Sequence, residues 1–139
     1  MTGPILQVDN VSKRFGDFVA LDNINLAVES GERLGLIGPN GSGKSTLVNC
    51  ICGTLHNEAG RVLFDGQAID GKIAHERTRL GIARSFQLPR PFHSLTLADN
   101  LRIPLLYTVH ARVGPLRSIG DLDARCDELH AVTYYPTWD

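Results

Sequence analysis

The sequence predicts an α/β fold that carries an antiparallel β-subdomain at its N-terminus. Residues 5–11 and 24–29 alternate apolar and polar side chains, which predicts two strands joined in an antiparallel manner. A turn at 30–32 leads into a short apolar run at 34–37, which predicts a buried strand, and then into a glycine-rich loop and a helical apolar pattern. The order of strand, loop and helix is the basis of the α/β assignment. The first two strands precede this strand–loop–helix unit and are consistent with a mixed sheet.

Further elements follow from local signals. Gly53 is expected to cap the C-terminus of the helix after the loop. The apolar pattern of residues 61–66 predicts a strand that ends in an Asp-Gly turn, with a return strand at 67–69. Residues 74–80 predict a short helix that ends at Gly81, and 82–86 predict another strand. A capping box predicts a helix from Thr96, broken or kinked at Pro104.

The glycine-rich loop has the spacing Gly38-x-x-x-x-Gly43-Lys44-Ser45, which is the P-loop pattern. Glycines let the backbone turn tightly and point successive N–H groups inward, where they can bind phosphate oxygens. The helix that opens near Gly43 adds unpaired N–H groups and the positive end of its dipole. Lys44 can reach the β and γ phosphates of a nucleotide, and the Ser45 hydroxyl is a hard oxygen ligand suited to Mg²⁺. The loop therefore predicts a nucleotide-phosphate site.

Composition restricts the other possibilities. A chain of 139 residues with 42% hydrophobic and 21% charged residues is typical of one soluble domain. The net charge of -1 argues against a nucleic-acid partner, and three cysteines without a paired framework indicate a reducing compartment. Neither an export signal nor an apolar stretch long enough to cross a membrane occurs in the sequence. We therefore expect a cytoplasmic protein whose membrane role, if it has one, depends on a partner.

From about residue 5 to residue 106, the chain resembles the ATP-binding subunits of ABC transporters. The resemblance rests on five segments, which are Val11-Ser12-Lys13-Arg14-Phe15-Gly16, Ala20-Leu21-Asp22-Asn23-Ile24, the loop Gly38 to Thr46, Gly60 to Gly66, and Ile82 to Gln87. The last segment, followed by Leu88-Pro89-Arg90-Pro91-Phe92, looks most like the branched-chain amino acid importers. The resemblance implies that residues 1–139 form the N-terminal part of one ATP-binding domain, in which residues 107–139 diverge from the family pattern.

The resemblance also implies roles for particular residues. Phe15 matches the aromatic position that stacks on adenine, and Gln87 matches the Q-loop glutamine, which coordinates Mg²⁺ and orients water. The expected catalytic residues are Lys44 and Gln87, and the expected metal ligands are Ser45 and Gln87. The expected nucleotide-binding residues are Phe15, Gly38, Pro39, Asn40, Gly41, Ser42, Gly43, Lys44, Ser45 and Thr46. The cofactors that the resemblance implies are ATP and Mg²⁺.

By the same resemblance, the loop after Gln87 faces transmembrane permease subunits, and a second ATP-binding subunit completes the site. A periplasmic binding protein takes part indirectly, and the chain lies at the inner face of the cell membrane. Two family features are missing from the sequence, namely the Walker B strand ending in Asp-Glu and the signature loop. We therefore expect a C-terminally truncated or frame-shifted chain with an incomplete central sheet. Such a chain would bind ATP weakly if at all and would not hydrolyse it.

Other readings of the same sequence stay open. One alternative is a non-catalytic nucleotide-binding remnant or regulatory module, which would not need the Asp-Glu pair of the Walker B strand. Another is the ATPase of a lipopolysaccharide exporter, with which the segment after Gln87 is also compatible. ABC-type ATPases that act on DNA stay open as well. A GTPase or a small-molecule kinase would also contain a P-loop, but the Asn-Lys-x-Asp pattern that a GTPase needs does not occur in the sequence.

Overall fold

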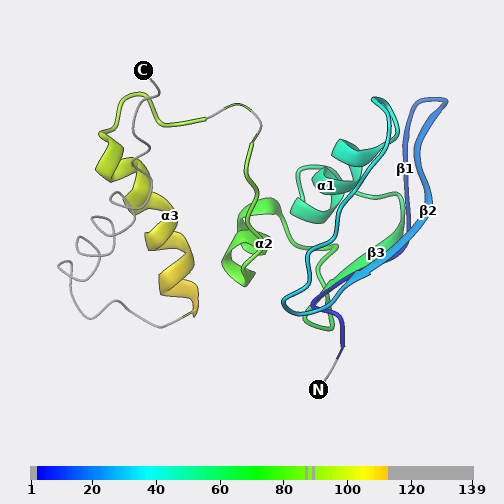
Figure 1. Cartoon of the computed structure of the whole chain (residues 1–139), viewed down its shortest axis with the longest axis horizontal. Coiled ribbons are helices and arrows are strands. Elements are labelled where there is room, and N and C mark those ends of the chain that lie inside the picture. The colour runs from blue at the N-terminus through cyan, green and yellow to red at the C-terminus, as the bar shows by residue number, and fades with distance from the viewer. Residues whose placement is uncertain (1–2, 87, 89, 113–139) are drawn as a thin grey trace. The chain divides into compact units, whose positions relative to one another are not determined.

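The computed structural model describes residues 3–86, 88 and 90–112, with the backbone alone described for 107–112. Contacts divide the chain into two compact units, Met1–Arg77 and Thr78–Asp139. The first unit contains a four-stranded sheet and helix α1 (Lys44–Cys52), and the second contains helix α3 (Leu97–Arg112) (Figure 1). Helix α2 (Ala74–Leu80) includes the boundary between the units. In the part of the chain that is described, no helix is both long and apolar enough to cross a bilayer.

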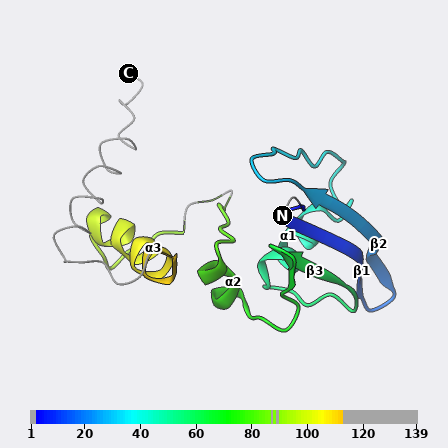
Figure 2. The same cartoon turned by 90° about the horizontal axis from the view of Figure 1, so that it is seen from below.

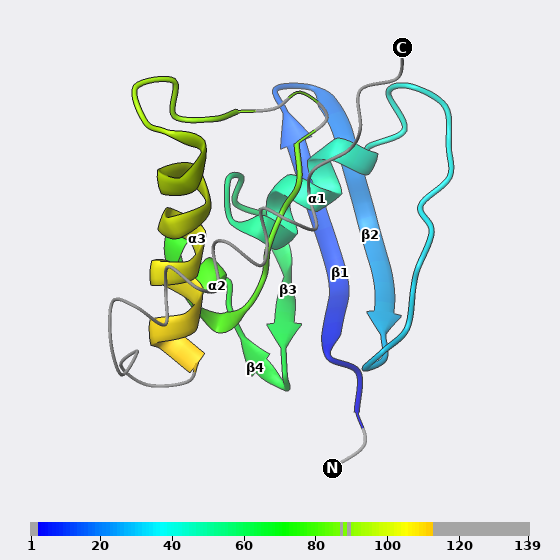
Figure 3. The same cartoon turned by 60° about the vertical axis from the view of Figure 1, so that its left-hand side comes forward.

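The sheet of the first unit is antiparallel throughout. Strands β1 (Leu6–Phe15), β2 (Phe18–Val28), β3 (Ala59–Phe64) and β4 (Gln67–Ala68) lie in the order β2-β1-β3-β4 (Figure 3). This confirms the predicted antiparallel N-terminal subdomain, including the hairpin between β3 and β4. Strands β1 and β2 are longer than the sequence pattern predicts because they continue to a hairpin that closes at the pair Phe15 and Phe18.

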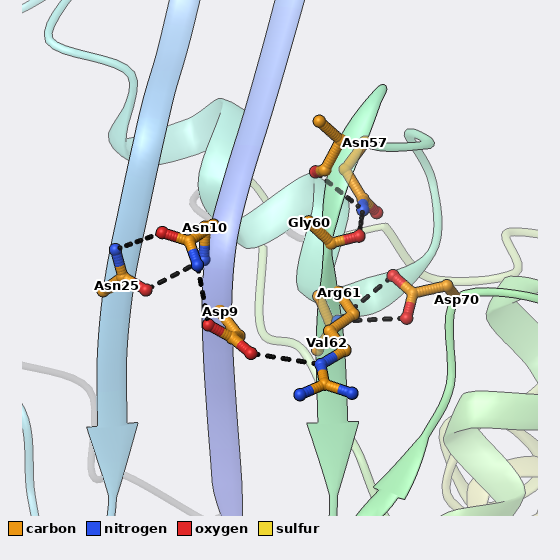
Figure 4. A network of polar contacts seen from close by, with 9 residues as sticks. Asp9, Asn10, Asn25, Asn57, Gly60, Arg61, Val62 and Asp70 are labelled. Atoms are coloured by element: carbon orange, nitrogen blue, oxygen red, sulfur yellow. Dashed lines mark hydrogen bonds and ion pairs between the residues drawn. The ribbon is translucent and has the colours of Figure 1, made fainter.

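A β-bulge in β1 explains why the alternating pattern stops short. Between the pairs Val8–Leu26 and Val11–Ile24, β1 has one residue more than β2, so Val8 and Val11 are both buried although they are three positions apart. Asn10 adopts a left-handed conformation with φ of 51°. Its backbone N–H donates to Oδ1 of Asn25 at 2.9 Å, and the amide of Asn25 donates back to the side chain of Asn10 at 3.1 Å (Figure 4).

The neighbouring strand β3 is shaped to fit this bulge. A Cβ at Gly60, which has φ of +77°, would overlap the carbonyl group of Asn10, so only glycine allows the two backbones to approach this closely. On the same strand, Arg61 pairs with Asp9 of β1 at 3.1 Å, and the carboxylate of Asp70 accepts the backbone N–H of Val62 (Figure 4). These polar contacts hold β3 in register beside the bulged strand.

Helix α1 covers one face of the sheet and closes a small core (Figure 2). The buried apolar side chains come from the sheet, the helix and the residue after β4, and they are Val8, Val11, Leu21, Leu47, Cys50, Val62 and Ile69. Burial raises the pKa of the Cys50 thiol, as expected for a cysteine that packs like a small apolar residue. The helix ends at Gly53, which has φ of 84° and whose N–H donates to the carbonyl of Asn49, so the predicted glycine cap is confirmed.

Arg77 joins the C-terminal end of α1 to the start of α2. Its side chain is fully buried, and its guanidinium donates to four backbone carbonyl oxygens, those of Cys50, Ile51, Lys72 and Asp70, at 2.7, 3.0, 2.8 and 3.4 Å. Burial lowers the pKa of Arg77, but a guanidinium remains protonated at neutral pH. The charge therefore lies at the negative end of the α1 dipole and satisfies carbonyl groups that the helix leaves unpaired.

In the second unit, helix α3 begins where the capping pattern predicts. The backbone N–H of Asp99 donates to the Thr96 hydroxyl at 3.2 Å, and that hydroxyl donates to the Asp99 carboxylate at 2.6 Å. The hydrogen bond from Thr96, followed by that from Arg102, lowers the pKa of Asp99. The helix continues through Pro104 to Arg112, so the expected break at this proline does not occur, and the alternative expectation, a kink there, stays a prediction.

Two predicted strands do not form. Residues 34–37 run without sheet pairing, and the residues Leu34, Leu36 and Ile37 are 48%, 44% and 99% exposed. Residues 82–86 are also irregular. A strand requires a neighbouring backbone to satisfy its N–H and C=O groups, and no described segment pairs with either run. Local apolar character predicted these strands, but the pairing that would complete them is missing among the described residues.

The contacts of Arg77 lead to a prediction about stability. We expect Arg77→Met to lower the free energy of unfolding by roughly 2 to 4 kcal/mol because it leaves buried carbonyl oxygens without donors. Urea unfolding followed by circular dichroism measures this change. The matched control is Arg79→Met, which alters an exposed arginine of the same helix. Equal unfolding midpoints for the two variants would contradict the structural role of Arg77.

Candidate phosphate-binding site

The candidate site is formed where the glycine-rich loop enters helix α1. The helix begins at Lys44, and its first hydrogen bond runs from the N–H of Leu47 to the carbonyl of Gly43. Gly43 is the N-cap and provides no side-chain cap, so the N–H groups of the first turn have no partner within the helix. Before the helix, the N–H of Ser42 donates to the carbonyl of Pro39 and closes a turn. The loop thus presents backbone donors at the positive end of a helix dipole.

The glycines of the loop have different structural roles. Gly43 has φ of +91°, and a Cβ there would lie 2.5 Å from the carbonyl oxygen of Ala20, so its absence lets the loop rest directly on β2. Gly38 instead makes room for a side chain, because a Cβ on it would lie 2.7 Å from Oγ of Ser42. Gly41 has φ of +83° and open space around it, so only its backbone conformation requires glycine there.

The ammonium group of Lys44 is held by the loop itself. Nζ donates to the carbonyls of Gly38 and Pro39 at 2.5 and 2.7 Å and to Oγ of Ser42 at 3.0 Å. Because an ammonium group has three donors, all of them are used. The two carbonyl bonds place the positive charge within the curve of the loop, and the third bond is to a hydroxyl that a phosphate oxygen could replace.

A pocket with a volume of about 210 Å³ lies beside the loop. Its lining comes from the loop, the first turn of α1 and the start of β2, and consists of Phe18, Ala20, Asn40, Gly41, Ser42, Gly43, Lys44, Ser45 and Thr46. The strand β2 has a bulge at this point, because Arg14 pairs with Val19 whereas Lys13 pairs with Leu21, which leaves Ala20 as the extra residue. The bulge therefore lies at the wall of the pocket.

The structure brings together most of the expected site residues, but not all. Asn40 to Thr46 line one pocket, and Gly38 and Pro39 contact it through the ammonium of Lys44. Phe15 does not line this pocket; the residue is 48% exposed, and the ammonium of Lys13 lies 5.4 Å from the centre of its ring. Gln87 lies outside the described residues, so its expected roles stay predictions.

Two residues that line the pocket, Phe18 and Ala20, belong to none of the motifs in the sequence. A signal for Phe18 was available in the segment Phe15-Gly16-Asp17-Phe18, because a Gly-Asp pair between two aromatic residues is typical of a two-residue hairpin turn. Such a turn places Phe18 beside Phe15 at the same end of the subdomain. Nothing comparable marks Ala20, whose position depends on the bulge.

A metal ion at this site would depend on few protein ligands. In the described part of the chain, no group of three or more His, Cys, Asp or Glu residues is arranged to hold a metal ion. The exposed hydroxyl of Ser45 lines the pocket and is a hard oxygen donor that fits Mg²⁺. Since Mg²⁺ usually keeps several waters and binds substrate phosphates, one hydroxyl is compatible with a metal that arrives with its nucleotide.

Solved structures with a similar fold are ATP-binding cassettes. A nucleotide-free cassette from an ABC transporter is 34% identical with a TM-score of 0.72, over 92% of this chain and 53% of that one. The ADP conformation of another cassette is 36% identical with a TM-score of 0.66, over 99% of this chain and 49% of that one. Together with the loop, this similarity defines the fold as a P-loop α/β domain preceded by an antiparallel β-subdomain.

Sequence comparisons identify the family. The family model for the ABC transporter matches residues 21–133, which is more than half of the sequence. The chain belongs to the ABC transporter family.

Relatives with similar sequences include several ATP-binding proteins of amino acid transport. A probable branched-chain amino acid transport ATP-binding protein LivG of Archaeoglobus fulgidus is 46% identical over 71% of this chain and 38% of its own length. The BraF protein of Pseudomonas aeruginosa, a high-affinity branched-chain amino acid transport ATP-binding protein, is 39% identical over 74% of this chain and 40% of its own length. This chain therefore spans about two fifths of the length of these relatives.

The close contact between the loop and β2 leads to a prediction about the glycines. We expect Gly41→Ala to lower the free energy of unfolding by about 1 to 2 kcal/mol, the cost of a left-handed backbone at a residue with a side chain. Gly43→Ala carries this cost and also a clash with Ala20, so we expect a loss of about 2 to 5 kcal/mol. Urea unfolding of both variants measures the difference. An equal loss for the two variants would show that the loop does not rest on β2 as described.

Proposed function

We propose that this chain binds ATP with Mg²⁺ in the pocket beside the loop, as part of the ATP-binding subunit of an ABC transporter. The observation that carries the proposal is the position of Lys44, whose ammonium is held by loop carbonyls at the wall of a pocket that Asn40 to Thr46 line. A positive charge, a helix N-terminus and free backbone N–H groups then meet at one cavity. The natural ligand for that combination is a polyphosphate.

The residues of the site have separable tasks in the proposed complex. Backbone N–H groups of the first turn of α1 donate to phosphate oxygens, and Lys44 exchanges its bond with Ser42 for one to the β or γ phosphate. The hydroxyl of Ser45 binds the Mg²⁺ that accompanies the nucleotide, and this ion offsets the phosphate charge. Phe15 and Gln87 keep their proposed roles in adenine stacking and in binding metal and water. Similar structures support nucleotide binding, since one is described with ADP and another, a dimer, with ADP and Pi.

The proposed transport process is the import of branched-chain amino acids or similar polar solutes. Its support is the printed function of the LivG and BraF relatives. A spermidine/putrescine import ATP-binding protein of Pseudomonas aeruginosa is also similar, at 33% identity over 92% of this chain and 32% of its own length, and it too is an import protein. The proposed partners are a second ATP-binding subunit and permease subunits that contact the loop after Gln87 at the inner face of the membrane.

Lys44 provides the test of nucleotide binding. We expect Lys44→Ala to weaken Mg²⁺–ATP binding at least tenfold, because a charged hydrogen bond to phosphate is lost. The measurement is an NMR chemical-shift titration with ATP up to millimolar concentration, which also detects weak binding. Lys72→Ala is the matched control because Lys72 does not line the pocket. Binding that is absent in the unmodified chain, or equal in the two variants, would disprove the proposed site.

We also propose that the 139-residue chain does not hydrolyse ATP by itself. Hydrolysis needs a carboxylate that aligns the attacking water, and the sequence contains no apolar strand followed by Asp-Glu. We expect phosphate release by the purified chain to match that of Lys44→Ala in a colorimetric assay. Release that is higher in the unmodified chain and depends on Lys44 would show that the chain is catalytic.

A further inference from the structure

The pocket beside the loop has an aromatic wall that the P-loop pattern does not include. Of the residues that line the pocket, seven belong to the continuous segment from Asn40 to Thr46, and the other two, Phe18 and Ala20, come from the start of β2. Strand β2 is brought to the loop by the close approach of Gly43 to Ala20. Phe18 therefore lines the same cavity as the phosphate-binding groups.

Phe18 and Phe15 have different surroundings although they are neighbours. They form the closing pair of the β1–β2 hairpin, and residues directly opposite each other in an antiparallel pair lie on the same face of the sheet. Lys13 lies 5.4 Å from the centre of the Phe15 ring and is itself paired with Glu58 at 3.5 Å. Phe18 lines the pocket, whereas Phe15 does not.

The chemistry of the lining divides the pocket into two regions. The loop and the first turn of α1 provide backbone N–H groups, an ammonium and hydroxyls, all of which suit phosphate. Phe18 provides a flat apolar surface, and 59% of this residue is exposed, so a ligand that covers it removes apolar area from water. A phosphate group gains nothing from this surface, but a sugar and a base linked to that phosphate do.

We propose that Phe18 contacts the sugar–base part of the nucleotide whose phosphates lie in the loop. This inference rests on the proposed function and adds a specificity-determining residue to it. Phe18 makes the pocket prefer a nucleoside triphosphate to an inorganic polyphosphate of the same charge. Phe18 makes this contact from the wall of the pocket beside the loop, and Phe15 keeps its proposed role of stacking on adenine.

The test compares two probes, Mg²⁺–ATP and Mg²⁺–tripolyphosphate, in NMR titrations of the 139-residue chain. We expect Phe18→Ala to weaken ATP binding about three- to tenfold, the usual range for losing one aromatic contact, and to leave tripolyphosphate binding unchanged. Phe18→Tyr keeps the flat ring and should restore ATP binding. Val19→Ala is the matched control, because Val19 is the exposed neighbour of Phe18 and does not line the pocket.

The outcomes separate this inference from the proposed function. If Lys44→Ala weakens both probes whereas Phe18→Ala leaves ATP binding equal to that of Val19→Ala, the role of Phe18 is disproved and the phosphate site stands. If Phe18→Ala weakens both probes equally, the residue shapes the loop and does not contact the nucleoside, which also disproves the inference. If Lys44→Ala weakens neither probe, the phosphate site fails and the inference fails with it. Circular dichroism of each variant confirms that it is folded.

Discussion

The contact on which the candidate site depends is the close approach of Gly43 to the carbonyl oxygen of Ala20. Only a residue without a Cβ allows the loop to lie this close to β2, and its left-handed backbone turns the chain into α1 at the same position. One wall of the pocket belongs to the loop and the other to the bulged start of β2, so this contact forms the cavity. A larger residue at position 43 would separate the two walls.

Different interactions hold the two ends of helix α1. At its N-terminus the unpaired N–H groups face the loop that Lys44 closes, and at its C-terminus Gly53 and the buried guanidinium of Arg77 satisfy the last carbonyls. A positive group at the C-terminus complements the helix dipole and leaves the N-terminus as the place where a negative ligand is favoured. Arg77 lies in the first unit, so its hydrogen bonds join α1 to the segment around Asp70 and Lys72 of the same unit.

The elements that the sequence predicted correctly are those with strong local signals. The left-handed cap at Gly53, the Asp65-Gly66 turn between β3 and β4 and the hydroxyl cap at Thr96 depend on residues close in the chain, so a short stretch of sequence is sufficient to predict them. The apolar run at 34–37 looks equally clear, yet its apolar residues are exposed and no strand among the described residues pairs with it. Strand formation requires a partner distant in sequence, which local patterns do not reveal.

The sequence by itself determined the identity of the loop, the charge at Lys44, the hydroxyl at Ser45 and the antiparallel N-terminal subdomain, because spacing and alternation encode them directly. Only the tertiary structure showed that Phe18 lines the pocket, that Gly38 makes room for Ser42 and that a buried guanidinium ends α1. Each of these features joins residues from different elements. Their contacts arise from strand register, bulges and helix packing, which are set by the balance of burial and hydrogen bonding over the whole unit and not by any short segment of the chain.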